Sequence, residues 1–163
     1  MAGDYAQMRR DIWGDSDWTD LSPMAQWLYW VITTDPKIEL TGVADWRPKR
    51  MLKKAAALTV DLFEAAAEEL QAKAFIVVDE DTEEVMIRTY VKHDDLLKSP
   101  NMGRAIARLY PTIASKTLRG VLVHELHKLR DEQPDLKGFP ALAQVMMNAR
   151  IDARELVAER FAA

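Results

Sequence analysis

Five basic side chains lie within eight positions of this sequence, and they are the residues best placed to do chemistry. They are Arg47, Lys49, Arg50, Lys53 and Lys54, and we call them the cation strip. No acidic residue occurs between Trp46 and Leu58, although the whole chain has a net charge of -4. On a helix over 46–57, all five would fall on one half of the surface and the apolar residues on the other. Phosphate groups are the natural ligands of such a strip, while a merely solvated helix face is the alternative.

A second, more dispersed set of polar and basic residues follows the predicted hairpin. Its side chains can contact phosphates, and an asparagine among them can also contact a base edge. The set consists of Lys98, Asn101, Arg104, Arg108, Lys116 and Arg119. We predict that DNA is bound mainly through the cation strip, with these residues in a supporting role.

Other chemistries lack the residues or the spacing that they need. His124 and His127 lie three positions apart, whereas the helical metalloprotease motif needs a spacing of four. The acids around Asp15 and Asp20 lack the glycine and the final acid of a calcium loop. There is no cysteine and no glycine-rich phosphate loop. We therefore expect no catalytic residue, no metal and no cofactor, and we predict that the protein is not an enzyme.

Length and composition restrict the class of protein further. A chain of 163 residues can bury one substantial core with added elements, but not two catalytic domains. Its first residues lack a signal-peptide pattern, and no apolar run approaches the length of a membrane span. These features predict a cytoplasmic protein that has no contact with a membrane.

The elements that must position the cation strip follow from caps and periodicity. Ser22-Pro23 opens a helix that Asp35-Pro36 ends. Asp45, Thr59 and Ser115 are predicted N-cap residues, and two β-branched runs flank an acidic turn. The predicted elements are a strand over 5–10, helices over 22–35, 46–57 and 59–74, and a hairpin over 75–91. This order is typical of a winged helix-turn-helix, so the fold class is mainly α with a small hairpin (α+β). We predict a winged-helix domain over 1–91.

The rest of the chain is predicted to form helices joined by one linker. A helical extension over 92–131 packs on the first domain, a linker covers 132–140, and one amphipathic helix runs from 141 to about 161 within the final segment 141–163. One apolar stripe follows this last helix: Leu142, Val145, Met146, Ala149, Ala153, Leu156 and Val157. Such a stripe must be covered. It either folds back on the preceding domain or forms a homo-oligomer, and the sequence leaves both alternatives open.

Acidic residues oppose DNA binding at the position where a helix-turn-helix contacts the major groove. The helix over 59–74 turns Asp61, Glu64 and Glu68 outward, and the hairpin turn over 79–84 carries five acids. Phosphates would repel both surfaces. DNA must therefore be bound by the helix over 46–57 and by the segment after the hairpin. Otherwise the domain is a protein-interaction adaptor that docks a host or phage protein through the acidic helix 59–74 and the hairpin 75–91.

Four segments carry a resemblance to a known family. They are residues 11–23, 42–50, 78–85 and 117–126, and they resemble small actinobacterial phage proteins described as helix-turn-helix or replication-initiation proteins. The helix opened by Ser22-Pro23, the Gly42-Val43 turn and the segment 88–93 are also similar to the N-terminal winged helix of phage replisome organisers. The resemblance covers about the first 138 residues. It implies DNA-linked work in replication or regulation inside an infected host cell, and it implies no catalytic residues.

Overall fold

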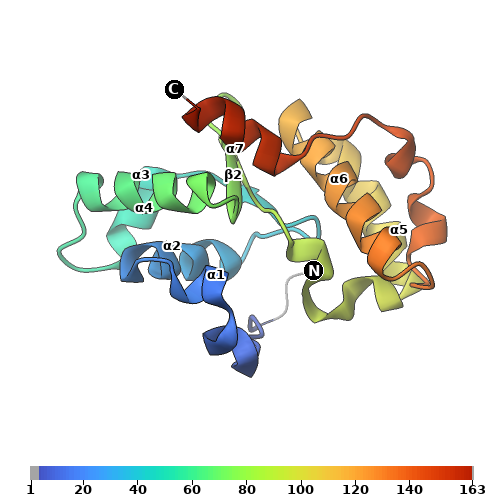
Figure 1. The fold of residues 1–163 in the computed structure, drawn as a ribbon, viewed down its shortest axis with the longest axis horizontal. Coiled ribbons are helices and arrows are strands. Elements are labelled where there is room, and N and C mark those ends of the chain that lie inside the picture. Colours follow the sequence, from blue (N-terminus) through green and yellow to red (C-terminus); the bar gives the residue numbers. More distant parts are fainter. Residues whose placement is uncertain (1–3, 163) are drawn as a thin grey trace.

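The computed structural model describes residues 4–162, so residues 1–3 and 163 of the first and last predicted segments lie outside the described residues. The chain is mostly helical, with one small antiparallel sheet of three strands. Figure 1 shows the helices in two groups, one on either side of the strands. The prediction of a mainly helical α+β fold is therefore confirmed.

The sheet is the layer that joins the two groups of helices. Its strands are β1 (Val43–Asp45), β2 (Ile76–Asp79) and β3 (Glu84–Ile87), in the order β1-β3-β2. Successive side chains of a strand point to opposite faces of the sheet, and both faces are covered here. One face contributes Ala44, Ile76, Val85 and Ile87 to a first core, and the other contributes Val43 and Met86 to a second core.

The strand that we predicted over 5–10 is wrong. Residues 6–9 are irregular and are followed by the 3-10 helix η1 (Arg10–Gly14), so the third strand comes from β1 instead. Gly42 makes this possible, because it adopts a positive φ of 84°. A Cβ atom at this position would lie 2.5 Å from the Cβ of Tyr90. The chain therefore turns into β1 at a place where only glycine fits.

The predicted Ser22 cap of the first helical layer is confirmed, whereas Asp45, predicted as an N-cap, is the last residue of β1. After the single-turn helix α1 (Ser16–Thr19), helix α2 (Pro23–Thr33) begins with the Ser22 side chain accepting the N–H of Ala25 at 3.2 Å. The Trp18 ring packs edge-on against Tyr29, with ring centroids 5.2 Å apart. Trp18 is 2% exposed and Tyr29 is 7% exposed, so this aromatic contact belongs to the first core. Burial raises the pKa of the Tyr29 hydroxyl to about 12, so this group is neutral at physiological pH.

The helix that we predicted over 46–57 is much shorter. It consists of α3 (Pro48–Met51) and the 3-10 turn η2 (Leu52–Lys54). Its start is delayed because the Trp46 N–H donates to the Glu83 carbonyl at 2.7 Å, which extends the sheet by one residue. Its end comes early because Ala55 is extended and Ala57 has a positive φ of 59°. The cation strip therefore lies on the four residues of α3, the three residues of η2 and the preceding Arg47 instead of on one regular helix.

Helix α4 (Val60–Ala72) and the hairpin of β2 and β3 agree with the prediction, with two differences. The Thr59 side chain caps α4 by accepting the N–H of Leu62 at 3.2 Å. The Leu62 side chain is 46% exposed although helical spacing predicts it on the apolar face, because the buried face of α4 is centred on Phe63, Ala66 and Leu70. The second strand ends at Ile87, not at 91, and the chain turns into a 3-10 helix after it.

The second helical layer covers the other face of the sheet. It contains η3 (Tyr90–Lys98), α5 (Pro100–Leu109), η4 (Tyr110–Thr112) and α6 (Lys116–Glu132). The Ser115 side chain caps α6 by accepting the N–H of Leu118, as predicted. Leu118, Leu122 and Leu126 are fully buried along α6 and form the centre of the second core.

The single C-terminal helix that we predicted over 141–161 is wrong. The segment forms two 3-10 turns, η5 (Phe139–Leu142) and η6 (Val145–Met147), then an extended stretch, and only then helix α7 (Ala153–Phe161). Gly120 of α6 receives the extended stretch, because the Ile151 N–H donates to the Gly120 carbonyl at 3.0 Å. A Cβ at Gly120 would lie 2.6 Å from the Ile151 side chain. The segment therefore folds back onto α6.

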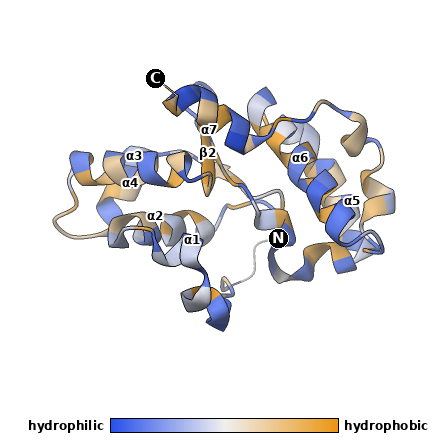
Figure 2. Ribbon diagram, in the orientation of Figure 1, coloured by the Kyte–Doolittle hydropathy of each residue, from blue (hydrophilic) through white to orange (hydrophobic). Residues whose placement is uncertain are grey.

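The fold-back of the C-terminal segment buries most of the apolar stripe that could have served for self-association. Leu142, Val145, Met146 and Ala153 are buried in the chain's own second core, and Leu156 packs partly against it. Val157 is half-buried and Ala149 is exposed. Figure 2 shows the hydrophobic and hydrophilic residues distributed around these short elements instead of along one face of a long helix. The fold-back alternative is thus the one that the structure shows, and a homo-oligomer loses this support.

One buried ion pair links the strands to the second helical layer. Arg88 follows β3, and its Nη1 atom lies 3.0 Å from Oε1 of Glu125 on α6. The Arg88 side chain is 13% exposed and the Glu125 side chain is 1% exposed. The Arg88 Nε–H also donates to the Ala74 carbonyl at 2.5 Å. Oε2 of Glu125 is buried without a hydrogen-bond partner in the described part of the chain.

Candidate nucleic-acid interface

The cation strip is a surface of exposed side chains at the start of the α3–η2–α4 sequence. Lys49, Arg50, Lys53 and Lys54 are all exposed, and none has a carboxylate oxygen within 4.0 Å among residues 4–162. Met51 is the buried anchor of this turn, with 4% of its surface exposed. The strip therefore presents four positive charges that no carboxylate in the described part of the chain neutralises.

Arg47 differs from the rest of the cation strip, because it is paired within the protein. Its Nη1 atom lies 2.9 Å from Oε2 of Glu83 in the hairpin turn, and the two side chains are 45% and 56% exposed. Exposed pairs of this kind contribute only about 0–1 kcal/mol to stability. A phosphate can replace Glu83 as the partner of Arg47 at small cost.

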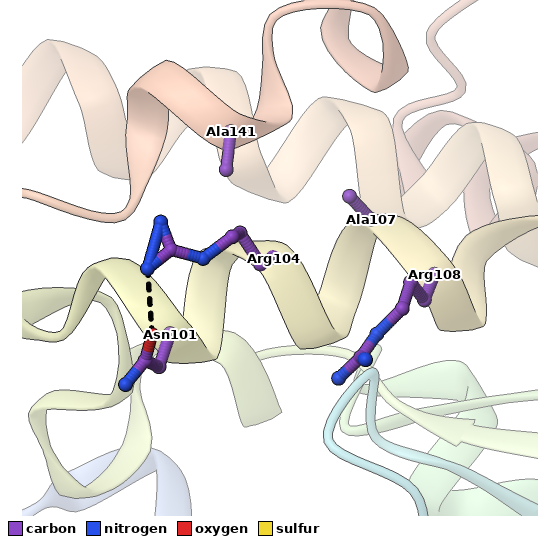
Figure 3. A pocket seen from close by; sticks show the side chains of 5 residues that line it. All are labelled: Asn101, Arg104, Ala107, Arg108 and Ala141. Carbon is purple, nitrogen blue, oxygen red and sulfur yellow. Dashed lines mark hydrogen bonds between the residues drawn. The ribbon is translucent and has the colours of Figure 1, made fainter.

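Three residues of the second predicted set meet in one groove. Asn101, Arg104 and Arg108 of α5 line an open groove of about 670 Å³, together with Ala107 and with Ala141 of η5. The Arg104 Nη2–H donates to Oδ1 of Asn101 at 2.7 Å. Figure 3 shows Asn101, Arg104 and Arg108 on α5, with Ala141 on the neighbouring segment above Arg104 and the Arg108 guanidinium extending away from Ala141. We call this feature the α5 groove.

The other three members of that set do not line the groove. Lys98 is paired with Asp95 at 2.8 Å, and both side chains are exposed. Lys116 is exposed on the first turn of α6, and Arg119 is half-buried on the same helix. The structure therefore divides the predicted patch into a groove with two arginines and scattered single cations.

The acidic hairpin has a structural role that the sequence did not reveal. The Glu84 carboxylate accepts the N–H groups of Ala114 and Ser115, at 3.0 and 2.8 Å, immediately before α6. A hydrogen bond from the Ser115 side chain lowers the pKa of the Asp79 carboxyl, and N–H groups of the turn lower it further against the effect of burial. These acids cap the start of α6 and fix the hairpin to the second layer. Asp79 and Glu84 are therefore engaged within the chain, while Glu80, Asp81 and Glu83 of the same turn are exposed.

The acids of α4 fall into two groups. Asp61, Glu64 and Glu68 are exposed and have no cationic side chain within 4.0 Å in the described part of the chain. Glu69 instead caps α2, where its carboxylate accepts the Ser22 N–H at 2.8 Å and the Ser22 hydroxyl at 2.5 Å. Burial alone would raise the pKa of Glu69, but the Ser22 hydrogen bonds and the Lys73 ammonium bring it below its ordinary value. Only the first group repels an approaching phosphate.

The two histidines of α6 hold the C-terminal segment. Nε2 of His127 lies 2.8 Å from the Met146 carbonyl oxygen, and Nε2 of His124 lies 3.6 Å from the Asp152 carboxylate. Both side chains are partly buried. No group of three potential metal ligands occurs among the described residues.

A shallow apolar pocket of about 420 Å³ lies beside α7. It is lined by β2 residues Ile76 to Val78, by Thr117 of α6, and by α7 residues that include Leu156 and Phe161. Arg160 of α7 donates to the Gln71 side chain at 2.7 Å and so holds α7 against α4. This pocket presents no arrangement of polar groups that would do chemistry.

Two features of the interface escaped the sequence analysis. Glu83, the partner of Arg47, belongs to the turn that we treated only as a repulsive tip. Ala141, the wall of the α5 groove, lies in the segment that we predicted as an independent helix. Neither has a sequence signal, because each is defined by a contact between residues more than 30 positions apart.

Comparison of the chain with protein-family models, with curated proteins and with solved structures finds no match. No helix among residues 4–162 is long and apolar enough to cross a membrane.

Proposed function

We propose that the chain is a DNA-binding protein that holds duplex DNA through its phosphates. The observation that carries this proposal is the exposed cation strip, in which Lys49, Arg50, Lys53 and Lys54 have no acidic partner in the described part of the chain. Arg47 adds a fifth contact when it exchanges Glu83 for a phosphate. The protein is non-enzymatic in this proposal and needs no metal or cofactor.

The proposed fold of this unit is a winged helix. Its support is the order α2, β1, α3, α4, β2, β3 together with the pairing of β1 to β3, which matches the winged variant of helix-turn-helix. In such a fold α4 is the helix that would enter the major groove, and its exposed Asp61, Glu64 and Glu68 disfavour that position. Binding is therefore proposed to occur without contacts to base edges.

The biological setting is proposed from the family resemblance. Residues 11–23 and 42–50 resemble phage helix-turn-helix and replication-initiation proteins, so the proposed role is DNA replication or its regulation in the cytoplasm of an infected host cell. Phosphate-directed binding without base contacts suits an accessory role on DNA that another protein has selected.

Fluorescence anisotropy with a labelled duplex tests the proposal. Five phosphate contacts predict a slope of about -4.5 for the logarithm of affinity against that of salt concentration, which is about a 500-fold loss from 50 to 200 mM. Arg50→Gln combined with Lys54→Gln removes two contacts and should change this slope to about -2.7. Lys37→Gln with Arg154→Gln removes the same charge from other exposed positions and is the matched control.

Two results would contradict the proposal. One is an affinity and slope for the Arg50/Lys54 variant equal to those of the control variant. The other is a strong preference for one duplex over unrelated duplexes, because phosphate contacts carry no sequence information directly.

A second candidate function rests on a different surface. Val60 and Leu62 at the start of α4 are 54% and 46% exposed, and three unpaired acids lie beside them. This surface favours a protein-interaction adaptor that docks a host or phage protein through α4 and the hairpin of β2 and β3. Pulldown from host lysate with and without nuclease separates the two functions. Capture that resists nuclease and is lost in a Val60→Asp, Leu62→Asp variant would favour the adaptor.

A further inference from the structure

The α5 groove lies far from the cation strip. Figure 1 shows α3 near one end of the longest axis and α5 near the opposite end, with the strands between them. The groove is formed between α5 and η5, on the outer side of the second helical layer. A compact chain of this length has a radius of gyration of about 15 Å. Opposite ends of the molecule are therefore separated by more than the Debye length of about 8 Å at physiological salt.

The lining of the groove selects one chemical class of ligand. Two guanidinium groups and one carboxamide line it with two alanine methyl groups, and no carboxylate is among the lining residues. Asn101 accepts one Arg104 N–H and so orients the guanidinium, whose other N–H groups remain available. Arg108 lies one turn further along the same face and is exposed. Planar guanidinium groups bind phosphodiester oxygens through paired N–H groups, and Asn101 orients that of Arg104.

Backbone packing fixes the walls of the groove. The Gly138 N–H donates to the Leu97 carbonyl at 2.8 Å, which ties the start of η5 to the residues before α5. A Cβ at Gly103 of α5 would lie 2.2 Å from the Gly138 carbonyl oxygen, so the two backbones are in direct contact. The arginines consequently stand on a rigid support, and binding does not have to order the elements that carry them.

We propose that the α5 groove is a second, independent binding surface for a nucleic-acid backbone, so that one molecule of this protein bridges two duplex segments. This inference rests on the proposed function, because the first segment is held by the cation strip. The strands lie between α3 and α5, and the hairpin turn that joins β2 to β3 carries exposed acids, which disfavour one straight duplex that contacts both surfaces.

A bridging assay tests this inference with the full chain. A biotinylated duplex is fixed to beads, a fluorescent duplex of unrelated sequence is added with the protein, and the fluorescence retained on the beads is measured. Anisotropy with one duplex is recorded in parallel, and mass photometry reports the oligomeric state. Arg104→Gln with Arg108→Gln removes two contacts and should weaken the groove site about 60-fold at 100 mM salt. The Lys37→Gln, Arg154→Gln variant is the control.

The expected result is that the wild type and the control retain the fluorescent duplex. The Arg104/Arg108 variant should retain at least about tenfold less, while its affinity for a single duplex, carried by the cation strip, changes by less than about threefold. Thermal melting of the variant should match that of the wild type, because both arginines are exposed.

Three results would overturn the inference. The first is a wild type that binds one duplex but bridges none. The second is bridging that persists in the Arg104/Arg108 variant, which would assign it to self-association through the strip. The third is loss of single-duplex affinity in that variant equal to the loss in the Arg50/Lys54 variant, which would make one continuous site. Failure of the wild type to bind any duplex would instead refute the proposed function.

Discussion

Replacing Glu125 by leucine should destabilise the protein strongly, because it leaves the Arg88 guanidinium buried without its ion-pair partner. Leucine is similar in size to glutamate, so the change removes a charge while leaving little cavity. Loss of one partner of a buried pair costs about 3–5 kcal/mol. Arg88 keeps its hydrogen bond to the Ala74 carbonyl and is 13% exposed, so we expect the lower end of that range, about 3 kcal/mol.

The assay for this prediction is a double-mutant cycle measured by urea unfolding. Arg88→Met alone should cost at least as much, since it also leaves the buried Ala74 carbonyl without this donor, at about 1–3 kcal/mol. The double variant should be more stable than the Arg88→Met protein, because neither charge then remains unpaired. For a chain of this size, 3 kcal/mol corresponds to a fall in Tm of about 6–12 °C. A Glu125→Leu protein within about 1 kcal/mol of the wild type, or additive single changes, would refute the reasoning.

Three further predictions concern other contacts of the fold. Since Glu69 has a lowered pKa in the folded state, its stabilising effect is present above the unfolded pKa near 4.5 and is lost as pH falls through the folded value. Glu69→Gln should therefore flatten the loss of stability on acidification, and an unchanged acid profile in urea titrations would contradict this. Gly120→Val places methyl groups against Ile151 and should lower stability by about 1–3 kcal/mol, seen as a lower urea midpoint. Truncation after Gly138 removes buried Leu142, Val145 and Met146 and should abolish cooperative unfolding; a stable truncated monomer would contradict the observed fold-back.

The sequence predicted those elements whose ends are encoded by local chemistry. Ser22, Thr59 and Ser115 cap their helices as predicted, because an N-cap needs only a side-chain oxygen and an amide three residues away. The hairpin was predicted for a similar reason, since a run of β-branched residues on each side of a polar turn is a local pattern.

The errors arose where distant residues decide the local structure. Trp46 favoured a helix start in the sequence, but its N–H is taken by Glu83 on the hairpin, so the helix begins later. The 141–161 stripe has helical spacing, yet η5 and η6 bury its residues against a surface that α5 and α6 supply. Strand β1 has only three residues, too few for a period of two to be recognised, and it exists because β3 offers it a free edge.

The candidate site also combines features that local sequence predicts with features that depend on distant residues. The exposure of the five cation-strip residues followed from the sequence, because solvation of charged side chains needs no tertiary contact. The α5 groove was predicted only as a row of residues on α5, since the wall that makes it a groove comes from Ala141. The neutralising role of Glu83 was missed, because nothing in the hairpin turn identifies which acid will lie beside Arg47.

Covering the sheet on both faces has a consequence for how this protein could have been assembled in evolution. A fragment containing only the first 91 residues would expose Val43, Met86 and Val91 to water, so an ancestor of the first layer alone would have needed a different sequence on that face. Side chains alternate along β3: Val85 and Ile87 point toward one layer and Met86 points toward the other. The strand therefore packs against both layers. Gain or loss of the C-terminal half by recombination at residue 91 would thus be selected against, and the two halves are expected to be inherited together.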